Sequence, residues 1–333
     1  MNDTWHMRRA LRLAEKGLGW TGANPMVGAV LVKDGERIGE GFHSRFGGPH
    51  AEIEALNSCT QDPKGSTLYV TLEPCAHEGK TPPCVEAILQ SGISRVLIAD
   101  LDPSKKVHGK GVALLKQAGL DVEVGLLREE ARRMNRFFYT LHEKNRPWVT
   151  LKVAMSLDGK ISAEADAPTP LTGLSAQRYV HGLRHEHQSI LVGAGTVLSD
   201  DPHLGVRLFS GTDPLRIVMK GHRELPQTLR IFRDENVLVH EGQKLGELMQ
   251  VLYEKEVHSI LVEGGHDIFS SFLSAGWVDE LQVLIAPILL GKEALPFCEV
   301  TGSLPLHLLK TKALGPDVLM VYRPKDKSGL PQE

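Results

Sequence analysis

Short apolar runs typical of strands alternate with amphipathic helical segments along nearly the whole chain, and this alternation constrains the fold most. Asp34-Gly35 lies between two stretches of alternating apolar residues and predicts a two-residue hairpin turn within residues 27–41. Around it we expect a first helix from Asp3 or Thr4 to just before Gly17, strands at 67–72, 95–99 and 122–125, and helices at 51–58, 82–90 and 111–118. Such an order predicts a mostly parallel sheet covered by helices.

The alternation stops at residues 142–148, a polar stretch interrupted by Pro147, and resumes beyond it. There we expect strands at 149–155, 189–193, 215–219, 237–240, 259–263 and 281–287, and helices at 177–184, 246–255 and 268–273. A chain of 333 residues is also long for one domain. We therefore predict two α/β domains in tandem, residues 1–145 and 146–326, followed by a flexible tail at 327–333.

Composition and charge indicate which kind of molecule the protein acts on. The net charge of -3 gives no reason to expect a nucleic-acid or membrane surface as partner. The longest apolar run, near residues 283–290, is far shorter than the roughly 18 residues of a membrane span, and the charged N-terminal segment does not resemble a secretory signal. We expect a cytoplasmic protein that acts on a small molecule. Its four cysteines are too few for a disulfide framework, and only Cys75 and Cys84 lie close together.

A histidine and these two cysteines form a candidate zinc site. His50, Cys75 and Cys84 are the three ligands that a catalytic zinc requires, with one position left open. Thr81 to Cys84 read as a helix cap, two prolines and a cysteine in the first turn, and Cys75 follows a strand at what we expect to be another helix start. Glu52 is then the proton shuttle between the attacking water and the departing amine. The alternatives are a closed structural site with His77 as fourth ligand, or two unrelated core cysteines.

Two glycine pairs mark the second half. Gly193 and Gly195 follow a strand but lack the rest of a dinucleotide fingerprint, so they favour a simple turn. Gly264 and Gly265 lead from a strand into a helix, where backbone N–H groups can bind an anion. A tight strand-to-helix connection explains this second pair equally well.

Several segments closely resemble one family, the bifunctional enzymes of riboflavin biosynthesis that join diaminohydroxyphosphoribosylaminopyrimidine deaminase to 5-amino-6-(phosphoribosylamino)uracil reductase. They are NPMVGAV (24–30), HAE (50–52), TLEPCAHEGKTPPC (71–84), LKVAMSLDGK (151–160), ILVGAGTVLSDDPHLGVR (190–207), VEGGHDIFSSFLSAGWVDEL (262–281), APILLG (286–291) and GPDVLM (315–320). The resemblance implies a cytidine-deaminase-like α/β/α domain, then a dihydrofolate-reductase-like α/β domain. It also implies Zn²⁺ and NADPH as cofactors, a phosphorylated pyrimidine as substrate, and a homodimer.

The resemblance further assigns residues. In the deaminase half it implies Glu52 as proton donor and Asn24, His43, His77 and Lys80 as substrate contacts. In the reductase half the cofactor contacts would be Ala154, Pro170, Thr196, Asp200, Gly221, Gly265, His266, Asp267, Ile268, Phe269, Ser270 and Ser271. The substrate contacts there would be Pro168, Arg184, Leu204, Arg207 and Glu263, and Lys152 would line the cofactor groove.

This chain departs from the family pattern in the reductase half. Pro170 stands where many members carry tryptophan, Gln177 where arginine is common, and Lys220-Gly221 where aspartate and serine are usual. We hypothesise that Lys220, His222 and Arg223 contact the 2′-phosphate of NADPH instead. The rival functions are a monofunctional zinc deaminase of a nucleoside or tRNA, with a non-catalytic second domain, and a structural zinc module.

Overall fold

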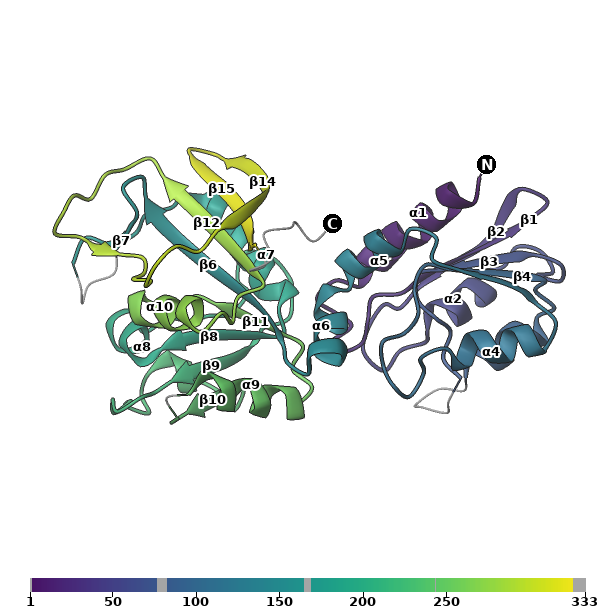
Figure 1. Ribbon diagram of the computed structural model, residues 1–333, viewed down its shortest axis with the longest axis horizontal. Coiled ribbons are helices and arrows are strands. Elements are labelled where there is room, and N and C mark those ends of the chain that lie inside the picture. The colour runs from purple at the N-terminus through teal and green to yellow at the C-terminus, as the bar shows by residue number, and fades with distance from the viewer. Residues whose placement is uncertain (1, 77–82, 165–168, 243, 326–333) are drawn as a thin grey trace. The chain divides into compact units, whose positions relative to one another are not determined.

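The computed structural model of the chain describes residues 2–76, 83–164, 169–242 and 244–325 (Figure 1). It forms two compact units, residues 1–145 and 146–333. Among the described residues, no helix is both long and apolar enough to cross a membrane.

The first unit is built on a five-stranded sheet in the order β2-β1-β3-β4-β5. The strands are β1 Gly28–Lys33, β2 Glu36–Phe42, β3 Thr67–Val70, β4 Arg95–Ile98 and β5 Asp121–Val124. The predicted hairpin is confirmed, since Asp34 and Gly35 both adopt positive φ between β1 and β2. β3, β4 and β5 are parallel, but β1 is antiparallel to both β2 and β3. The sheet is therefore mixed, and the expectation of a mostly parallel sheet is wrong for this unit.

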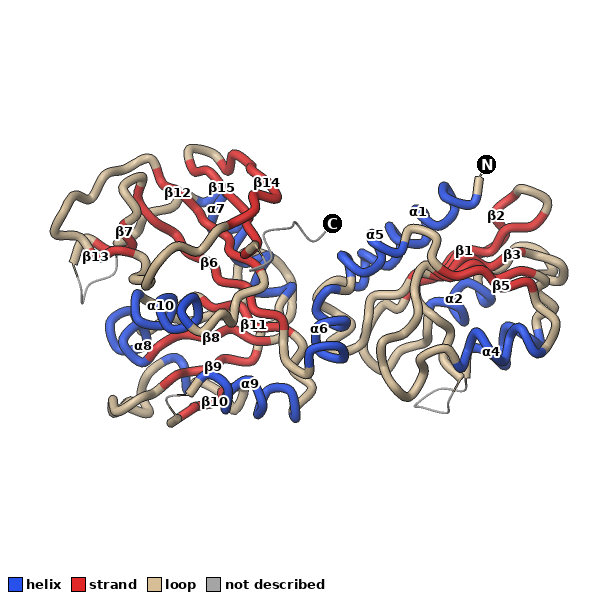
Figure 2. Tube along the Cα trace, in the orientation of Figure 1, coloured by secondary structure: helices blue, strands red, loops and turns tan. Residues whose placement is uncertain are grey.

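Helices cover both faces of this sheet. They are α1 Asp3–Ala14, α2 Ala51–Asn57, α3 Cys84–Gln90, α4 Lys110–Gln117, α5 Arg128–Met134 and α6 Arg136–Lys144. Figure 2 shows α1 and α5 on one side of the strands and α2 and α4 on the other. The cap of α1 is Asn2, whose side chain accepts from the Trp5 N–H, rather than Asp3 or Thr4 as expected.

Two glycines set how closely these helices approach the sheet. A Cβ at Gly28 would lie 2.0 Å from the carbonyl oxygen of Ala10 in α1. On the opposite face, a Cβ at Gly41 would lie 2.3 Å from the backbone nitrogen of Ala55 in α2. Only glycine permits this backbone contact, so β2 fixes the position of α2.

The second unit contains an eight-stranded sheet in the order β10-β9-β8-β11-β6-β12-β15-β14. Its strands are β6 Trp148–Ser156, β8 Ser189–Gly193, β9 Leu215–Met219, β10 Val237–His240, β11 Ser259–Val262, β12 Glu280–Ala286, β14 Leu306–Leu314 and β15 Asp317–Pro324. A small separate sheet pairs β7 Lys160–Ser162 with β13 Leu295–Pro296. From β10 to β12 all neighbours are parallel, as predicted, and β15 and β14 extend the sheet antiparallel.

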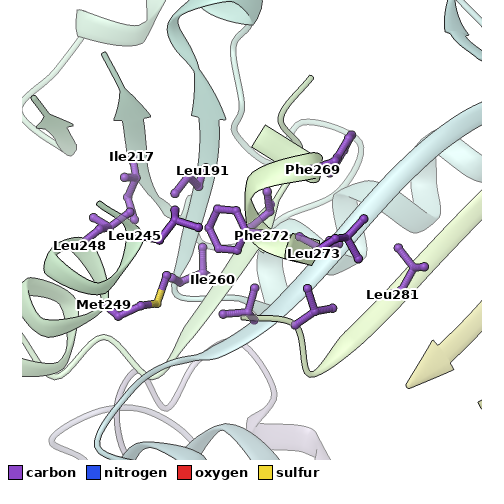
Figure 3. Packing of buried hydrophobic residues seen from close by; sticks show 14 of the residues in the cluster. Leu191, Ile217, Leu245, Leu248, Met249, Ile260, Phe269, Phe272, Leu273 and Leu281 are labelled. Carbon is purple, nitrogen blue, oxygen red and sulfur yellow. The ribbon is translucent and has the colours of Figure 1, made fainter. Parts of the chain in front are cut away.

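Four helices pack on this sheet: α7 Leu174–Glu186, α8 Ala194–Asp200, α9 Leu245–Glu254 and α10 His266–Ser274. Figure 3 shows the core that α9 and α10 form against the strands, with Phe272 of α10 between Leu191 and Ile260. A second cluster joins α7 and α8 to the other face through Leu183, Val192 and Val197. Because β6, β8, β9 and β11 are parallel, their carboxyl ends share one edge, the usual place for a ligand site in such sheets.

Candidate active sites

The first unit brings His50, Cys75 and Cys84 together as predicted. Their ligand atoms all lie within 4.8 Å of one another. His50 Nδ1 is 3.1 Å from the Sγ atom of Cys84 and 3.5 Å from that of Cys75. A tetrahedral zinc with ordinary bond lengths separates a nitrogen and a sulfur ligand by about 3.5 Å. The three side chains therefore fit a zinc ion without rearrangement.

Local backbone structure places these ligands. His50 is the N-cap residue of α2 and Cys84 is the first residue of α3. Cys75 lies in the loop after β3, so the expectation that it begins a helix is wrong. The Cys84 N–H at the start of α3 donates to Cys75 Sγ over 3.3 Å. Both sulfurs thus lie at one helix N-terminus, where the field of the helix favours negative charge.

The two cysteines differ in acidity. A hydrogen bond from the Cys84 thiol, with others from His50 and the Cys84 backbone, outweighs burial and lowers the pKa of Cys75 to about 4. The same hydrogen bond, together with burial, raises the pKa of Cys84. These hydrogen bonds therefore favour the charged form of Cys75, the form in which a cysteine binds a metal.

Glu52 lies in the first turn of α2 and its side chain is buried. Burial raises the pKa of Glu52 to about 7, although the nearby charge of His50 acts in the opposite direction. A carboxyl group with this pKa can take up and release a proton at neutral pH, which suits a general acid and base.

Asn24 and His43 lie beside the three ligands. His43 Nδ1 donates to the carbonyl oxygen of Pro49 over 3.0 Å, and Asn24 Nδ2 lies 3.1 Å from His43 Nε2. The His43 ring packs edge-on against that of His50, with centroids 5.7 Å apart. Burial lowers the pKa of His43, so the ring is neutral and its Nε2 accepts from Asn24. The two other residues expected here, His77 and Lys80, lie outside the described residues.

The second unit contains a cavity of about 910 Å³ at the carboxyl edge of its parallel strands, near the upper end of the usual size of ligand sites. Most of the expected contacts line it: Lys152, Ala154, Pro170, Arg184, Thr196, Asp200, Leu204, Gly221, Glu263, Gly265, His266, Asp267, Ile268 and Phe269. Ser270 and Ser271 line a neighbouring cavity instead, and Arg207 is exposed and lines neither. Pro168 lies outside the described residues.

A network of charges lies at the floor of this cavity. Arg184 donates to Glu263 through Nε (2.8 Å) and Nη2 (3.0 Å), and Lys152 Nζ lies 3.2 Å from the same carboxylate. Burial raises the pKa of Glu263, but the charges of Arg184 and Lys152 outweigh it and hold this pKa well below the usual range. One carboxylate with two cations leaves a net positive charge that suits an anionic ligand.

Two helix starts lie side by side at the cavity. Gly265 caps α10, and a Cβ there would lie 3.5 Å from Thr196 Oγ1 of α8. Neither cap residue, Gly193 or Gly265, has a side chain that could occupy the first N–H groups of its helix. The sequence favoured a simple turn at Gly193 and Gly195, but Gly193 is the N-cap residue of α8 and both glycines line the cavity. The position of these glycines directly after a strand could have indicated a ligand site. The sequence did not favour one because the third glycine of a dinucleotide fingerprint is missing.

The residues that depart from the family pattern also border the cavity. Pro170, Gln177, Lys220, His222 and Arg223 all line it. Lys220 pairs with Glu241 over 3.1 Å. The guanidinium of Arg223 lies close to the start of α8, 3.5 Å from the position of a Cβ at Gly195.

Comparisons with known proteins match both units of the chain. Residues 1–100 match the family described as "Cytidine and deoxycytidylate deaminase zinc-binding region", and residues 147–320 match the "RibD C-terminal domain". The chain is 38% identical to riboflavin biosynthesis protein RibD of Aquifex aeolicus over 96% of its own length and 98% of that protein. It is 37% identical to RibD of Escherichia coli (strain K12), over 96% of its length and 99% of that protein.

Solved structures cover both units. Acinetobacter baumannii RibD superposes with a TM-score of 0.93 at 35% identity, covering 97% of this chain and 99% of that one. The Thermotoga maritima diaminohydroxyphosphoribosylaminopyrimidine deaminase/5-amino-6-(5-phosphoribosylamino)uracil reductase gives 0.89 at 38% identity, covering 97% and 98%. These matches do not favour a monofunctional deaminase with an inert second domain. The chain belongs to the RibD family of riboflavin biosynthesis, bifunctional enzymes that unite a zinc-dependent deaminase with an NADPH-dependent reductase.

Proposed function

We propose that residues 1–145 hydrolyse an exocyclic amine of a diaminopyrimidinone that carries a ribosyl phosphate, and that residues 146–326 then reduce its ribose to a ribityl chain. The observation that carries the first step is the convergence of His50, Cys75 and Cys84 beside the buried Glu52. The cavity that surrounds Glu263 and the start of α10 supports the second.

In the deaminase step, His50, Cys75 and Cys84 would hold the zinc, which would supply the Lewis acidity that activates water at neutral pH. Glu52 accepts the proton that the attacking water loses and delivers it to the nitrogen that leaves as ammonia. Its pKa of about 7 allows both transfers at neutral pH. Neutral His43 holds the side chain of Asn24, which hydrogen-bonds the substrate. Substrate contacts of His43, His77 and Lys80 are assigned from the family resemblance.

In the reductase step, NADPH supplies the hydride. The start of α10 at Gly265 supports the binding of a cofactor phosphate, because it presents N–H groups to the cavity. Arg184, Arg207, Glu263, Leu204 and Pro168 are assigned to the substrate from the family resemblance. The two arginines suit its phosphate, although Arg207 lies outside the cavity lining. We also propose that the other expected cofactor contacts in the cavity bind NADPH, together with Ser270 and Ser271 beside them.

Arg223, supported by Lys220 and His222, binds the 2′-phosphate of the cofactor in this proposal. All three line the cavity near the start of α8. No ion pair of Arg223 is found among the described residues, whereas Glu241 already pairs with Lys220. We therefore assign the larger share of the contact to Arg223. The homodimer and the cytoplasmic location also stay proposals, which sedimentation and cell fractionation test.

The test supplies the phosphoribosylaminopyrimidine substrate with and without NADPH and follows ammonia and nicotinamide absorbance separately. We expect ammonia in both cases and NADPH oxidation only after deamination. Glu52→Ala should retain zinc and lose ammonia release. Ammonia without any NADPH oxidation would reject the reductase half of the proposal, and normal ammonia release by Glu52→Ala would reject the role of Glu52.

A further inference from the structure

A buried carboxylate two residues before Cys75 has a role that neither reaction step explains. The side chain of Glu73 is 4% exposed and lies against the start of α4. Its Oε2 accepts from the backbone N–H groups of Gly109 (2.9 Å) and Asp102 (3.3 Å), and its Oε1 accepts from that of Val112 (3.2 Å). Glu73 therefore binds three N–H groups of a segment about 30 to 40 residues further along the chain.

These contacts replace the missing cap of α4. The N-cap residue is Gly109, at a φ of 75°, and it has no side chain that could accept from the helix. In a capping box, the N-cap side chain accepts from the third helical N–H and the third residue accepts from the N-cap N–H. Here the one carboxylate of Glu73 accepts from both, since Val112 is the third residue of α4. The loop after β3 and the start of α4 are thus held as one piece.

Gly111 brings α4 into direct contact with the same loop. A Cβ at this position would lie 2.1 Å from the carbonyl oxygen of Pro74. Only glycine therefore allows α4 to approach the loop of residues 73–75 this closely. From the opposite direction, the first N–H of α3 donates to Cys75 Sγ, and the Val85 N–H donates to the Cys75 carbonyl oxygen over 3.3 Å. Residues 73–75 are therefore held between two helix starts.

We infer that Glu73 is a positioning residue for the zinc site: by capping α4 from the loop, it fixes the backbone so that Cys75 Sγ faces His50 and Cys84 before the metal binds. This inference rests on the proposed zinc ligands. Glu73 does not contact the metal or the substrate in this role. Residues that orient a metal ligand commonly contribute a factor of about 10 to 100 to metal affinity.

The test measures zinc affinity in the full-length chain by competition with a chromophoric chelator, for the wild type and Glu73→Gln. Glutamine keeps the shape but turns an NH₂ group toward backbone donors, so one of the three N–H groups loses its acceptor. We expect the dissociation constant for zinc to rise about 10- to 100-fold. The visible spectrum of the Co²⁺-loaded variant should also change in its thiolate charge-transfer and ligand-field bands.

A matched control separates positioning from general destabilisation. Leu115 is a fully buried residue of the same helix, so Leu115→Ala should lower the melting temperature of the first unit and leave the zinc dissociation constant within about threefold of the wild type. If Glu73→Gln does not fold, Glu73→Asp, which is one methylene shorter, is measured in the same way. Wild-type affinity in the Glu73 variant, or an equal loss in Leu115→Ala, would overturn the inference. Cys75→Ser tests the ligand set separately: tight zinc binding without that thiol would reject the zinc site itself.

Discussion

Replacement of Glu263 by glutamine removes the one negative charge from the network at the floor of the reductase cavity. The side chains of Glu263, Arg184 and Lys152 are only 8%, 12% and 13% exposed, so water screens these charges weakly. Glutamine keeps the size of the side chain and leaves two buried cations beside a neutral amide. We predict that this change destabilises the second unit and stops the reductase reaction, while the deaminase reaction continues.

The magnitude follows from the distances. At N–O separations of 2.8 to 3.2 Å, each pair gains about 5 kcal/mol of Coulomb energy at an effective dielectric constant of about 20. Desolvation of the ions offsets most of that gain, but removal of one partner leaves the other charges uncompensated and costs about 3–5 kcal/mol. For a unit of this size, the melting temperature should fall by about 10 °C.

The pH dependence gives a second measurement. Since the pKa of Glu263 is lowered in the folded state, its stabilising contribution is complete above the unfolded pKa of about 4.3 and is lost as the pH falls toward the folded pKa. Glutamine does not titrate. The difference in unfolding free energy between the wild type and Glu263→Gln should therefore be constant from pH 7 to about pH 5 and shrink below about pH 4.3.

The free energy of unfolding of the second unit can be measured within the full chain by urea unfolding with pulse-labelling hydrogen exchange, followed on peptides from β11. Glu247→Gln is the matched control, because Glu247 pairs with Lys244 on the surface, where the two side chains are 57% and 82% exposed, and its loss should change stability little. A loss below about 1 kcal/mol in Glu263→Gln at pH 7 would refute the reasoning. So would a difference from the wild type that grows as the pH falls.

Three further predictions follow from the two sites and the packing of α2. Removal of zinc with a chelator should abolish ammonia release and leave NADPH oxidation with the deaminated substrate unchanged, as measured in parallel on the same sample. Arg223→Ala should raise the dissociation constant of NADPH about tenfold and leave that of NADH unchanged in equilibrium titrations, whereas Lys220→Ala should have a smaller effect because of Glu241. Gly41→Ala should destabilise the first unit by about 1–3 kcal/mol in thermal unfolding, since its Cβ would lie 2.3 Å from the Ala55 nitrogen.

Local sequence patterns predicted the individual helices and strands better than they predicted which strands pair in the sheet. The Asp34-Gly35 turn determined the β1–β2 hairpin, because two residues can join only antiparallel strands. The antiparallel contact of β1 with β3 arises because the chain runs from β2 through α2 to the far side of β1, and no local pattern reveals this skipped neighbour. The charged segment of α5, with Ala131 as its only buried residue, has no apolar stripe that would distinguish it from a loop.

The grouping of His50, Cys75 and Cys84 could be predicted because few side chains bind zinc and each of the three lies next to a recognisable local feature. The reductase cavity could not be derived in the same way. Its lining comes from segments far apart in the sequence, among them β6, α7, the ends of β8 and β9, and the starts of α8 and α10. No local pattern shows that these segments meet, so the resemblance to a family was needed to assign their residues.

Two buried glutamates near the zinc site show what the sequence could not distinguish. Glu52 and Glu73 are 3% and 4% exposed, and each lies two residues from a zinc ligand. Burial raises the pKa of Glu52 to about 7, which suits a group that must move a proton. Glu73 accepts three backbone hydrogen bonds from the segment that begins α4, which suits a group that must stay in place. The difference lies in the donors that the fold brings to each carboxylate, and those of Glu73 come from residues 102–112, far from the motif in the sequence. A glutamate beside a ligand can therefore serve the reaction or the geometry of the site, and only the folded chain determines which.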